Sequence, residues 1–221
     1  MIDFVVMQRL WRLNRTLLQK LKDTGYDVSA DEDASAASLS AFEAAFPSRD
    51  KLERVFYPRA GTLAADRTPG GILLFFSELE EGKRQIGVDD IRRLHDKMET
   101  LKVKLALFSA NGPLSPKAKQ ELRKTQAPDL ARVVVLEDKE IMFNVSRHKR
   151  VPRHYLLTPT EAKKWLDATK LKRSQIPRMF SDEPQAKYFD ALPGDLICVT
   201  GFSPTVGKLA RHVVVVTRLG K

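Results

Sequence analysis

Two carboxylates and a lysine lie close together near the middle of the sequence. Asp129 follows Pro128, and Glu137 and Lys139 come shortly after it. This Pro-Asp…Glu-x-Lys pattern is typical of magnesium-dependent nucleases, in which two carboxylates hold the metal and the lysine steadies the attacking water. Such short acidic patterns often arise by chance, and a charged hairpin turn at residues 137–140, between strands at 133–136 and 141–145, is the simpler explanation. A nuclease therefore stays an alternative.

Other reactive residues do not form a recognisable site. Gly207-Lys208 looks like the end of a phosphate-binding loop, but Leu209 stands where Ser or Thr should bind magnesium. Cys198 is the only cysteine, which excludes a disulfide framework and a cysteine-rich metal centre within one chain. His148 and His154 have cationic neighbours that would repel a metal ion, so structural histidines are favoured. We expect no cofactor and no metal.

A phosphate-binding segment is a stronger candidate. Residues 111–119 place a loop, a helix start and two lysines in succession, with Ser115 as the cap and Pro116 at the first helical position. Backbone N–H groups at a helix start attract phosphate, and Lys117 and Lys119 would reinforce that attraction. The alternative is a capped surface helix that binds nothing.

The charge is divided unevenly along the 221 residues, whose formal net charge is +10. Residues 1–144 contain 23 basic and 22 acidic residues, whereas residues 145–221 contain 15 and 6. Such asymmetry indicates two modules with different partners. Nucleic acid and an acidic protein surface are both compatible with the basic second module.

The hydrophobic pattern predicts the elements that position these residues. In the first module we expect a helix ending at Gly25, a short helix at 39–45, strands at 72–76, 102–109, 133–136 and 141–145, and helices at 88–100 and 116–124. Alternating strands and helices predict an α/β sheet with flanking helices. In the second module we expect a helix starting at Thr158-Pro159-Thr160-Glu161, a short helix at 184–190, and paired strands at 196–200 and 213–217, which make a small α+β domain.

The apolar runs are short. Residues 72–76 and 213–216 are the longest strongly apolar stretches, far below the ~20 residues that span a bilayer. The first residues do not have the pattern of a secretory signal. We therefore expect an intracellular protein without a membrane partner.

Several segments of the second module resemble the pattern of one family in order and spacing. They are Val151-Pro152-Arg153-His154, Leu171-Lys172-x-Ser174-Gln175-Ile176-Pro177-Arg178, Asp182-x-Pro184-x-Ala186-x-Tyr188 and Gly194-Asp195. The first module adds Arg9-Leu10-Trp11-Arg12, Gly25-Tyr26, and Pro113 with Ser115-Pro116-x-Ala118. Through these segments the chain resembles, over nearly its whole length, the fifth common subunit of eukaryotic nuclear RNA polymerases, whose carboxy-terminal domain is similar to a small subunit of the archaeal RNA polymerase.

The resemblance implies a nuclear, non-catalytic subunit with two domains. Residues 1–144 would form an α/β jaw domain, related in fold to restriction endonucleases, that flanks downstream duplex DNA. Residues 145–221 would form an α+β assembly domain that docks on the largest subunit beside neighbouring small subunits, with no homo-oligomer. The residues expected nearest DNA are Ser115, Pro116, Lys117 and Lys119. The expected assembly residues are Pro152, His154, Gln175, Pro177, Arg178, Asp182, Pro184, Tyr188 and Gly194.

Some positions depart from that family's pattern. Lys149 and Arg150 stand where the family usually has an acidic and an apolar residue, and Gly207-Lys208-Leu209 replaces a Gly-Arg-Tyr-like segment. Because new surface charge changes which partner fits, the departures suggest a divergent copy restricted to RNA polymerase I, in the nucleolus. Two other readings stay open: a magnesium-dependent nuclease using Asp129, Glu137 and Lys139, and a free-standing basic DNA-binding protein.

Overall fold

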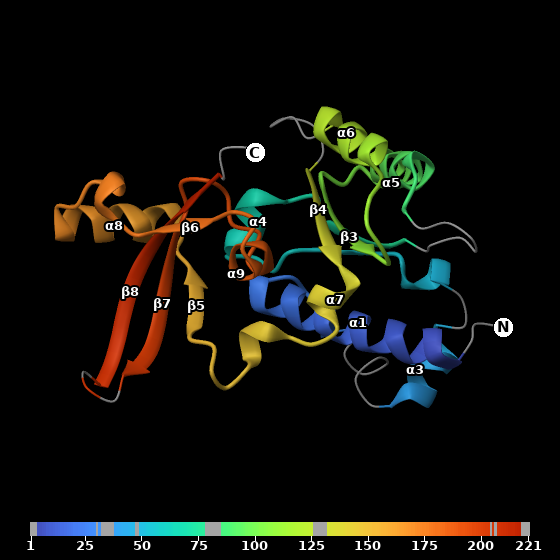
Figure 1. Ribbon diagram of the computed structural model, residues 1–221, viewed down its shortest axis with the longest axis horizontal. Helices are drawn as coiled ribbons and strands as arrows, with labels where there is room; N and C mark the ends of the chain where they lie inside the picture. Colours follow the sequence, from blue (N-terminus) through green and yellow to red (C-terminus); the bar gives the residue numbers. More distant parts are fainter. Residues whose placement is uncertain are drawn as a thin grey trace. The chain divides into compact units, whose positions relative to one another are not determined.

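Each half of the chain builds its own four-stranded sheet (Figure 1). The computed structural model describes residues 4–29, 31, 38–46, 49–77, 85–125, 132–203, 205 and 207–217. The chain divides into two compact units, Met1–Phe143 and Asn144–Lys221. Both units mix helices with strands, so the expectation of two mixed α and β domains is confirmed.

The first unit contains a mostly parallel sheet in the order β1-β2-β3-β4. Its strands are β1 (Arg54–Phe56), β2 (Ile72–Phe76), β3 (Leu105–Ala110) and β4 (Arg132–Glu137). Strands β2, β3 and β4 are parallel, and the edge strand β1 pairs with β2 in the antiparallel sense. Helices α5 (Val88–Thr100) and α6 (Pro116–Thr125) make the crossovers, which confirms the predicted alternation of strands and helices.

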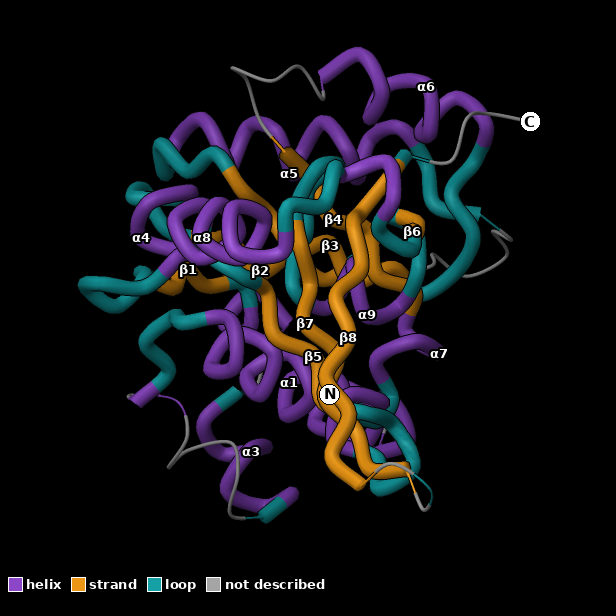
Figure 2. Tube along the Cα trace, turned by 90° about the vertical axis from the view of Figure 1, so that its left-hand side faces the viewer, coloured by secondary structure: helices purple, strands orange, loops and turns teal. Residues whose placement is uncertain are grey.

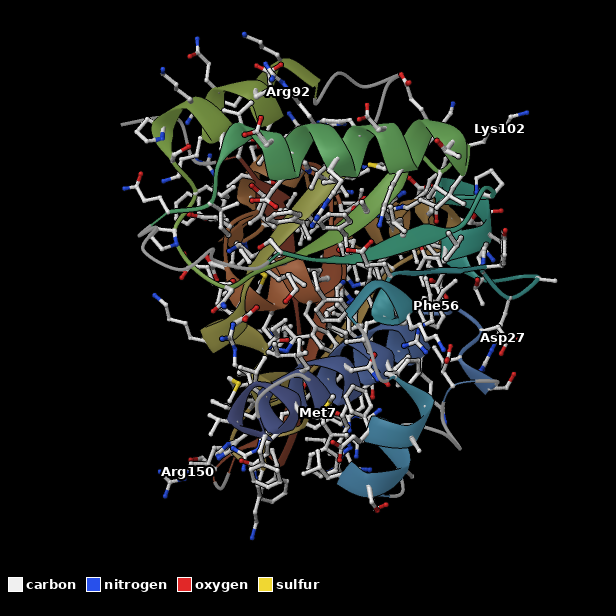
Figure 3. The ribbon with its side chains drawn as sticks, turned by 90° about the vertical axis from the view of Figure 1, so that its right-hand side faces the viewer. Met7, Asp27, Phe56, Arg92, Lys102 and Arg150 are labelled. Atoms are coloured by element: carbon white, nitrogen blue, oxygen red, sulfur yellow. The ribbon has the colours of Figure 1, made fainter. Side chains whose placement is uncertain are left out.

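Helices cover both faces of this sheet (Figure 3). On one face lie α1 (Phe4–Thr24), α3 (Leu39–Ala45) and the short α4 (Leu63–Arg67), and on the other lie α5 and α6. Successive strand residues point to opposite faces, so Leu107 joins the cluster under α1, whereas Phe108 joins the cluster under α5 and α6. The Phe108 ring stacks on Phe75 with 5.6 Å between centroids. Burial on both faces explains why β2 is wholly apolar.

The predicted hairpin at residues 133–145 is wrong. After β4 the chain enters the short helix α7 (Asp138–Ile141) instead of a turn, and no strand follows at 141–145. Glu137 caps this helix in a capping box, with its backbone N–H donating to Oε2 of Glu140 at 3.3 Å. Asp138 is buried, pairs with Arg9 of α1 and accepts a hydrogen bond from Oγ of Ser109 at 2.7 Å. The acidic run is therefore a helix start anchored by a distant arginine.

The second unit has a sheet in the order β5-β7-β8-β6. Its strands are β5 (Arg153–Leu156), β6 (Arg178–Phe180), β7 (Leu196–Ser203) and β8 (Gly207–Val216). Strands β5, β7 and β8 run side by side and antiparallel, whereas β6 is parallel to β8 (Figures 1 and 2). The predicted pairing of the last two strands is confirmed, although β8 begins earlier than expected. Strands β5 and β6 were not predicted.

Two helices pack on opposite faces of the second sheet. Ala162 of α8 (Pro159–Thr169) joins Leu196 and Val214 in one cluster, and Ala186 of α9 (Pro184–Tyr188) joins Ile197 and others in a second cluster. The predicted start of α8 is confirmed: Oγ1 of Thr158 accepts from the backbone N–H of Glu161 at 3.2 Å. The part of β8 from residue 208 to 211 is exposed on both faces. The second sheet is thus covered only at one end.

Candidate nucleic-acid and assembly surfaces

The loop before α6 is held by backbone hydrogen bonds. The N–H of Ile86 donates to the carbonyl of Pro113 at 3.0 Å, and the N–H of Ser115 donates to the carbonyl of Ile86 at 3.1 Å. Oγ of Ser115 accepts from the N–H of Ala118 at 3.2 Å and so caps the helix, while Pro116 is its first residue. The predicted helix start at Ser115-Pro116 is confirmed, and two backbone hydrogen bonds with Ile86 fix the position of the loop before it.

The two lysines at this helix start are exposed but point in different directions. Ala118, between Lys117 and Lys119, is 0% exposed and anchors α6 to the sheet. Residues two apart on a helix do not share a face. Lys119 instead shares a side with Arg123, four residues later, which is also exposed. Sequence reasoning missed Arg123, although its spacing of four from Lys119 could have revealed it.

Part of the expected assembly set builds internal turns. Oε1 of Gln175 accepts from the N–H of Lys172 at 2.8 Å. Gly194 has a φ of +94°, which suits glycine, and its N–H donates to the carbonyl of Val215 at 2.8 Å. The hydroxyl of Tyr188 accepts from Nδ2 of Asn144 at 2.8 Å. Each of these three residues thus makes a hydrogen bond within the second unit.

His154 also has an internal role. Its Nδ1 lies 2.8 Å from the carbonyl oxygen of Pro152. Burial lowers the pKa of His154, the hydrogen bond to the Pro152 carbonyl offsets part of that lowering, and the nearby positive charge of Arg211 adds to it. A neutral, hydrogen-bonded histidine agrees with the structural role expected from the sequence.

The remaining members of the set are exposed. Pro152 precedes β5, Arg178 begins β6, and Asp182 lies just after β6. Two prolines are exposed too: Pro184 is the first residue of α9, and the carbonyl of Pro177 accepts from the N–H of Val214 at 2.9 Å. Pro152, Pro177, Arg178 and Pro184 are open to solvent, whereas the exposed Asp182 already interacts within the chain, and the five residues belong to separate elements.

The candidate nuclease residues are not gathered around a cation. Asp129 lies outside the described residues. Nζ of Lys139 lies 2.9 Å from Oε2 of Glu137, and this hydrogen bond, with the attraction of the carboxylate, raises the pKa of Lys139. Among the described residues, no three histidine, cysteine, aspartate or glutamate side chains are arranged to hold a metal ion. Glu137 is thus engaged in capping α7 and pairing with Lys139.

The helices that the structure describes include none with the length and apolar character needed to cross a bilayer. The candidate surfaces are the basic start of α6 in the first unit and the exposed residues of the second unit. Both can bind by charge and hydrogen bonding.

Two family models match the chain. One, described as RNA polymerase Rpb5, N-terminal domain, matches residues 5–98, and the other, RNA polymerase Rpb5, C-terminal domain, matches residues 143–215. The subunit RPABC1 of DNA-directed RNA polymerases I, II, and III from Caenorhabditis elegans is 29% identical over 217 residues, which cover 97% of this chain and 99% of the relative. The Dictyostelium discoideum protein of that name is 26% identical over 202 residues, or 91% and 94% of the two chains.

Proposed function

The chain belongs to the Rpb5 family of RNA polymerase subunits, and on that premise we propose that it is a non-catalytic structural subunit of a nuclear DNA-directed RNA polymerase. The proposal rests on how much of the chain the family models and the relatives match. One family model matches residues 5–98 of the first unit, the other matches 143–215 and so covers most of the second unit, and a relative aligns over 97% of the chain. The proposal extends to this chain the assembly that the names of those relatives state.

The first unit is proposed to act as a jaw beside the downstream duplex, with a sheet related to that of restriction endonucleases. Three parallel strands with helices on both faces support this reading. The exposed Lys117, Lys119 and Arg123 of α6 supply positive charge, and the capped helix start supplies N–H groups. Contacts of this kind grip phosphates without reading sequence.

The second unit is proposed to dock on the largest subunit and on neighbouring small subunits. Its exposed Pro152, Arg178 and Pro184 are available to such partners. Its 15 basic and 6 acidic residues favour acidic protein surfaces, and part of that charge would add to the field around nearby DNA.

A pair of charge reversals tests the division of roles. Polymerase carrying Lys117→Glu with Lys119→Glu should assemble normally but release downstream duplex more readily, and the slope of log affinity against log salt should fall by roughly 2. Lys102→Glu with Lys104→Glu is the matched control, because these exposed lysines have the same spacing but precede β3 instead of following it. Failed assembly with unchanged DNA grip would mean that the roles of the units are reversed.

The two alternatives predict different behaviour of the isolated chain. A magnesium-dependent nuclease would cut supercoiled plasmid when magnesium is added, and Glu137→Gln would abolish the cutting. A free-standing DNA-binding protein would migrate alone in native extracts and bind duplex tightly without partners. Recovery of the chain with the largest polymerase subunit, and no cutting, is the result expected for a structural subunit.

A narrower proposal concerns which polymerase the chain serves. The exposed Lys149 and Arg150 lie in the unit proposed for assembly, and they depart from the family's usual residues. We propose that this chain is a divergent copy restricted to RNA polymerase I in the nucleolus, unlike relatives named for all three polymerases. Each nuclear polymerase should be purified through a subunit unique to it. Equal recovery of this chain from all three would overturn the restriction and leave the structural role intact.

A further inference from the structure

One edge of strand β8 is paired within its own sheet only at Val214–Val216, where β6 lies beside it. Val215 bonds toward β7, because its N–H donates to the carbonyl of Asp195 at 2.9 Å and its carbonyl accepts from Gly194. Val214 bonds the other way, with its N–H donating to the carbonyl of Pro177 on the β6 side. Backbone groups of successive strand residues alternate in direction. Residues 208, 210 and 212 therefore also point toward the β6 side.

No strand occupies that side along residues 208–212. Strand β6 pairs only with Val214–Val216, so within the described part of the chain the N–H and carbonyl groups of Lys208, Ala210 and His212 face an open edge. In Figure 1 the outer side of this part of β8 has no ribbon beside it. An open edge with aligned donors and acceptors is a template for an added strand.

The residues around this edge are basic and partly apolar. Lys208 and Arg211 are exposed, and among the described residues neither forms an ion pair with a carboxylate. The sequence contains no Asp or Glu from residue 196 to its last residue. Phe202 and Leu209 are 79% and 47% exposed on the same two strands. The edge thus lacks negative charge of its own and offers apolar contacts beside its cations.

A second copy of the chain would fit this edge poorly. Two copies paired antiparallel about Ala210 would place Lys208 opposite His212 and Leu209 opposite Arg211, so no carboxylate would meet a cation. Each copy also carries a formal net charge of +10. Repulsion between like charges opposes such pairing. An acidic segment would instead neutralise both cations.

We propose that the outer edge of β8, residues 208–212, binds an extended acidic segment of a partner protein as an added strand. Lys208 and Arg211 are three residues apart, so their side chains lie on opposite faces of the sheet. The added strand therefore carries two acidic residues with the same separation, one for each face. This proposal rests on the proposed function in one respect: if the chain is a polymerase subunit, the added strand comes from another protein of that complex.

Amide hydrogen exchange on the isotope-labelled full chain tests the proposal. The probe is a nine-residue peptide of Thr and Val that carries two glutamates three residues apart. On saturation, the amides of Lys208, Ala210 and His212 should exchange about tenfold more slowly, whereas those of Leu209 and Arg211, already bonded to β7, should change little. Exchange at residues 208, 210 and 212 that is unchanged at millimolar peptide would overturn the proposal.

Two variants separate strand addition from simple attraction of charge. Ala210→Pro removes an N–H that points to the open edge and should weaken peptide binding about tenfold, whereas the control Ala210→Ser keeps the N–H and should bind normally. Lys208→Glu with Arg211→Glu tests the charges without proline. This variant should reject the glutamate peptide and bind the same peptide with lysines in place of glutamates. An unchanged preference for glutamate would overturn the proposal.

The polymerase itself distinguishes this proposal from the proposed function. If the wild-type chain is not recovered with polymerase subunits, the structural role fails, whatever the peptide does. If the chain is recovered but the three open-edge amides exchange freely with the peptide present, the strand-addition proposal fails and the structural role stands.

Discussion

The two sheets of this protein differ in how much of each sheet its own helices cover. The first sheet has helices on both faces, and β2 and β3 are buried along their whole length. The second sheet is covered by α8 and α9 at one end, while residues 208–211 of β8 stay exposed. A sheet with two covered faces satisfies its own apolar side chains. We infer that the first unit is self-sufficient and that the second is completed by a partner.

The charges follow the same division. Cations of the first unit find carboxylates within that unit, as in the pairs of Arg9 with Asp138, Arg54 with Asp31 and Lys97 with Glu53. Residues 145–221 instead have 15 basic residues for 6 acidic ones. Because Trp11 lies in the first unit and Trp165 in the second, and the chain has two tryptophans, each unit carries its own fluorescent reporter. The comparison can therefore be tested one unit at a time.

The largest effect is expected in the core of the first unit. Phe108 is 0% exposed and stacks on Phe75, so Phe108→Ala should lower the free energy of unfolding by about 3–5 kcal/mol. Urea unfolding monitored through Trp11, in a Trp165→Phe background, measures the loss. The matched measurement through Trp165, in a Trp11→Phe background, should change far less. Equal losses at both reporters would show that the units do not unfold independently.

A smaller loss is expected at the start of α7. Asp138→Ala removes the partner of Arg9 and the acceptor of the Ser109 hydroxyl, and should cost about 1–3 kcal/mol. Asp138→Asn keeps an acceptor for Ser109 and should cost less. Thermal unfolding of the first unit, again followed by Trp11, measures both variants. A loss from Asp138→Ala no larger than that from Asp138→Asn would mean that the hydrogen bond from Ser109 contributes little and that the ion pair with Arg9 accounts for the loss.

The sequence predicted long elements well because their pattern is local. Helices α1 and α5 show an apolar face over several turns, and α8 begins with a capping box within four residues. Strands β5 and β6 were missed because they have only 4 and 3 residues and exist through pairing with β7 and β8, far along the chain. The hairpin at residues 133–145 was wrongly predicted for the same reason. Asp138, in the supposed turn, instead begins α7 and pairs with Arg9, which lies 129 residues away in the sequence.

The candidate surfaces show the same limit. The sequence indicated that Lys117 and Lys119 would be presented at a helix start, which needs only local capping by Ser115. The spacing of four between Lys119 and Arg123 is equally local, so their shared side of the helix could have been predicted but was overlooked. The open edge of β8 was not foreseen, because it depends on where β6 stops pairing. Surfaces defined by tertiary pairing require the fold.

A modest effect is expected at the cap of α8. Oγ1 of Thr158 accepts from the N–H of Glu161, so Thr158→Ala should cost the second unit about 1 kcal/mol. Thr158→Ser keeps the oxygen and is the control. Trp165 belongs to α8 and reports the loss directly, while Trp11 should report none. A loss at Trp11 of the same size would contradict the independence of the two units.

The same cap predicts a weak pH dependence that is confined to the second unit. Hydrogen bonds from the backbone N–H and then the hydroxyl of Thr158 lower the pKa of Glu161 from its ordinary value of 4.5. A carboxyl with a lowered pKa in the folded state stabilises the fold above 4.5, and this contribution is lost as the pH falls through the folded-state pKa. Glu161→Gln should therefore flatten the acid side of the stability curve reported by Trp165. An unchanged curve would show that this carboxyl is not coupled to folding.

The smallest effect is expected on the open part of the β7–β8 pair. Phe202 and Leu209 are 79% and 47% exposed, so Phe202→Thr and Leu209→Thr should change the stability of the isolated chain by no more than about 0.5 kcal/mol. Phe202 is paired with Lys208 and lies on the same face as that lysine, whereas Leu209 lies on the opposite face with Arg211, so each cation of the open edge has one exposed apolar neighbour. Urea unfolding followed by Trp165 measures both variants, and the same changes should weaken binding of the acidic probe peptide. A large loss of stability would instead mean that these side chains serve the fold itself, and the contrast between a self-sufficient unit and a unit completed by a partner would no longer hold.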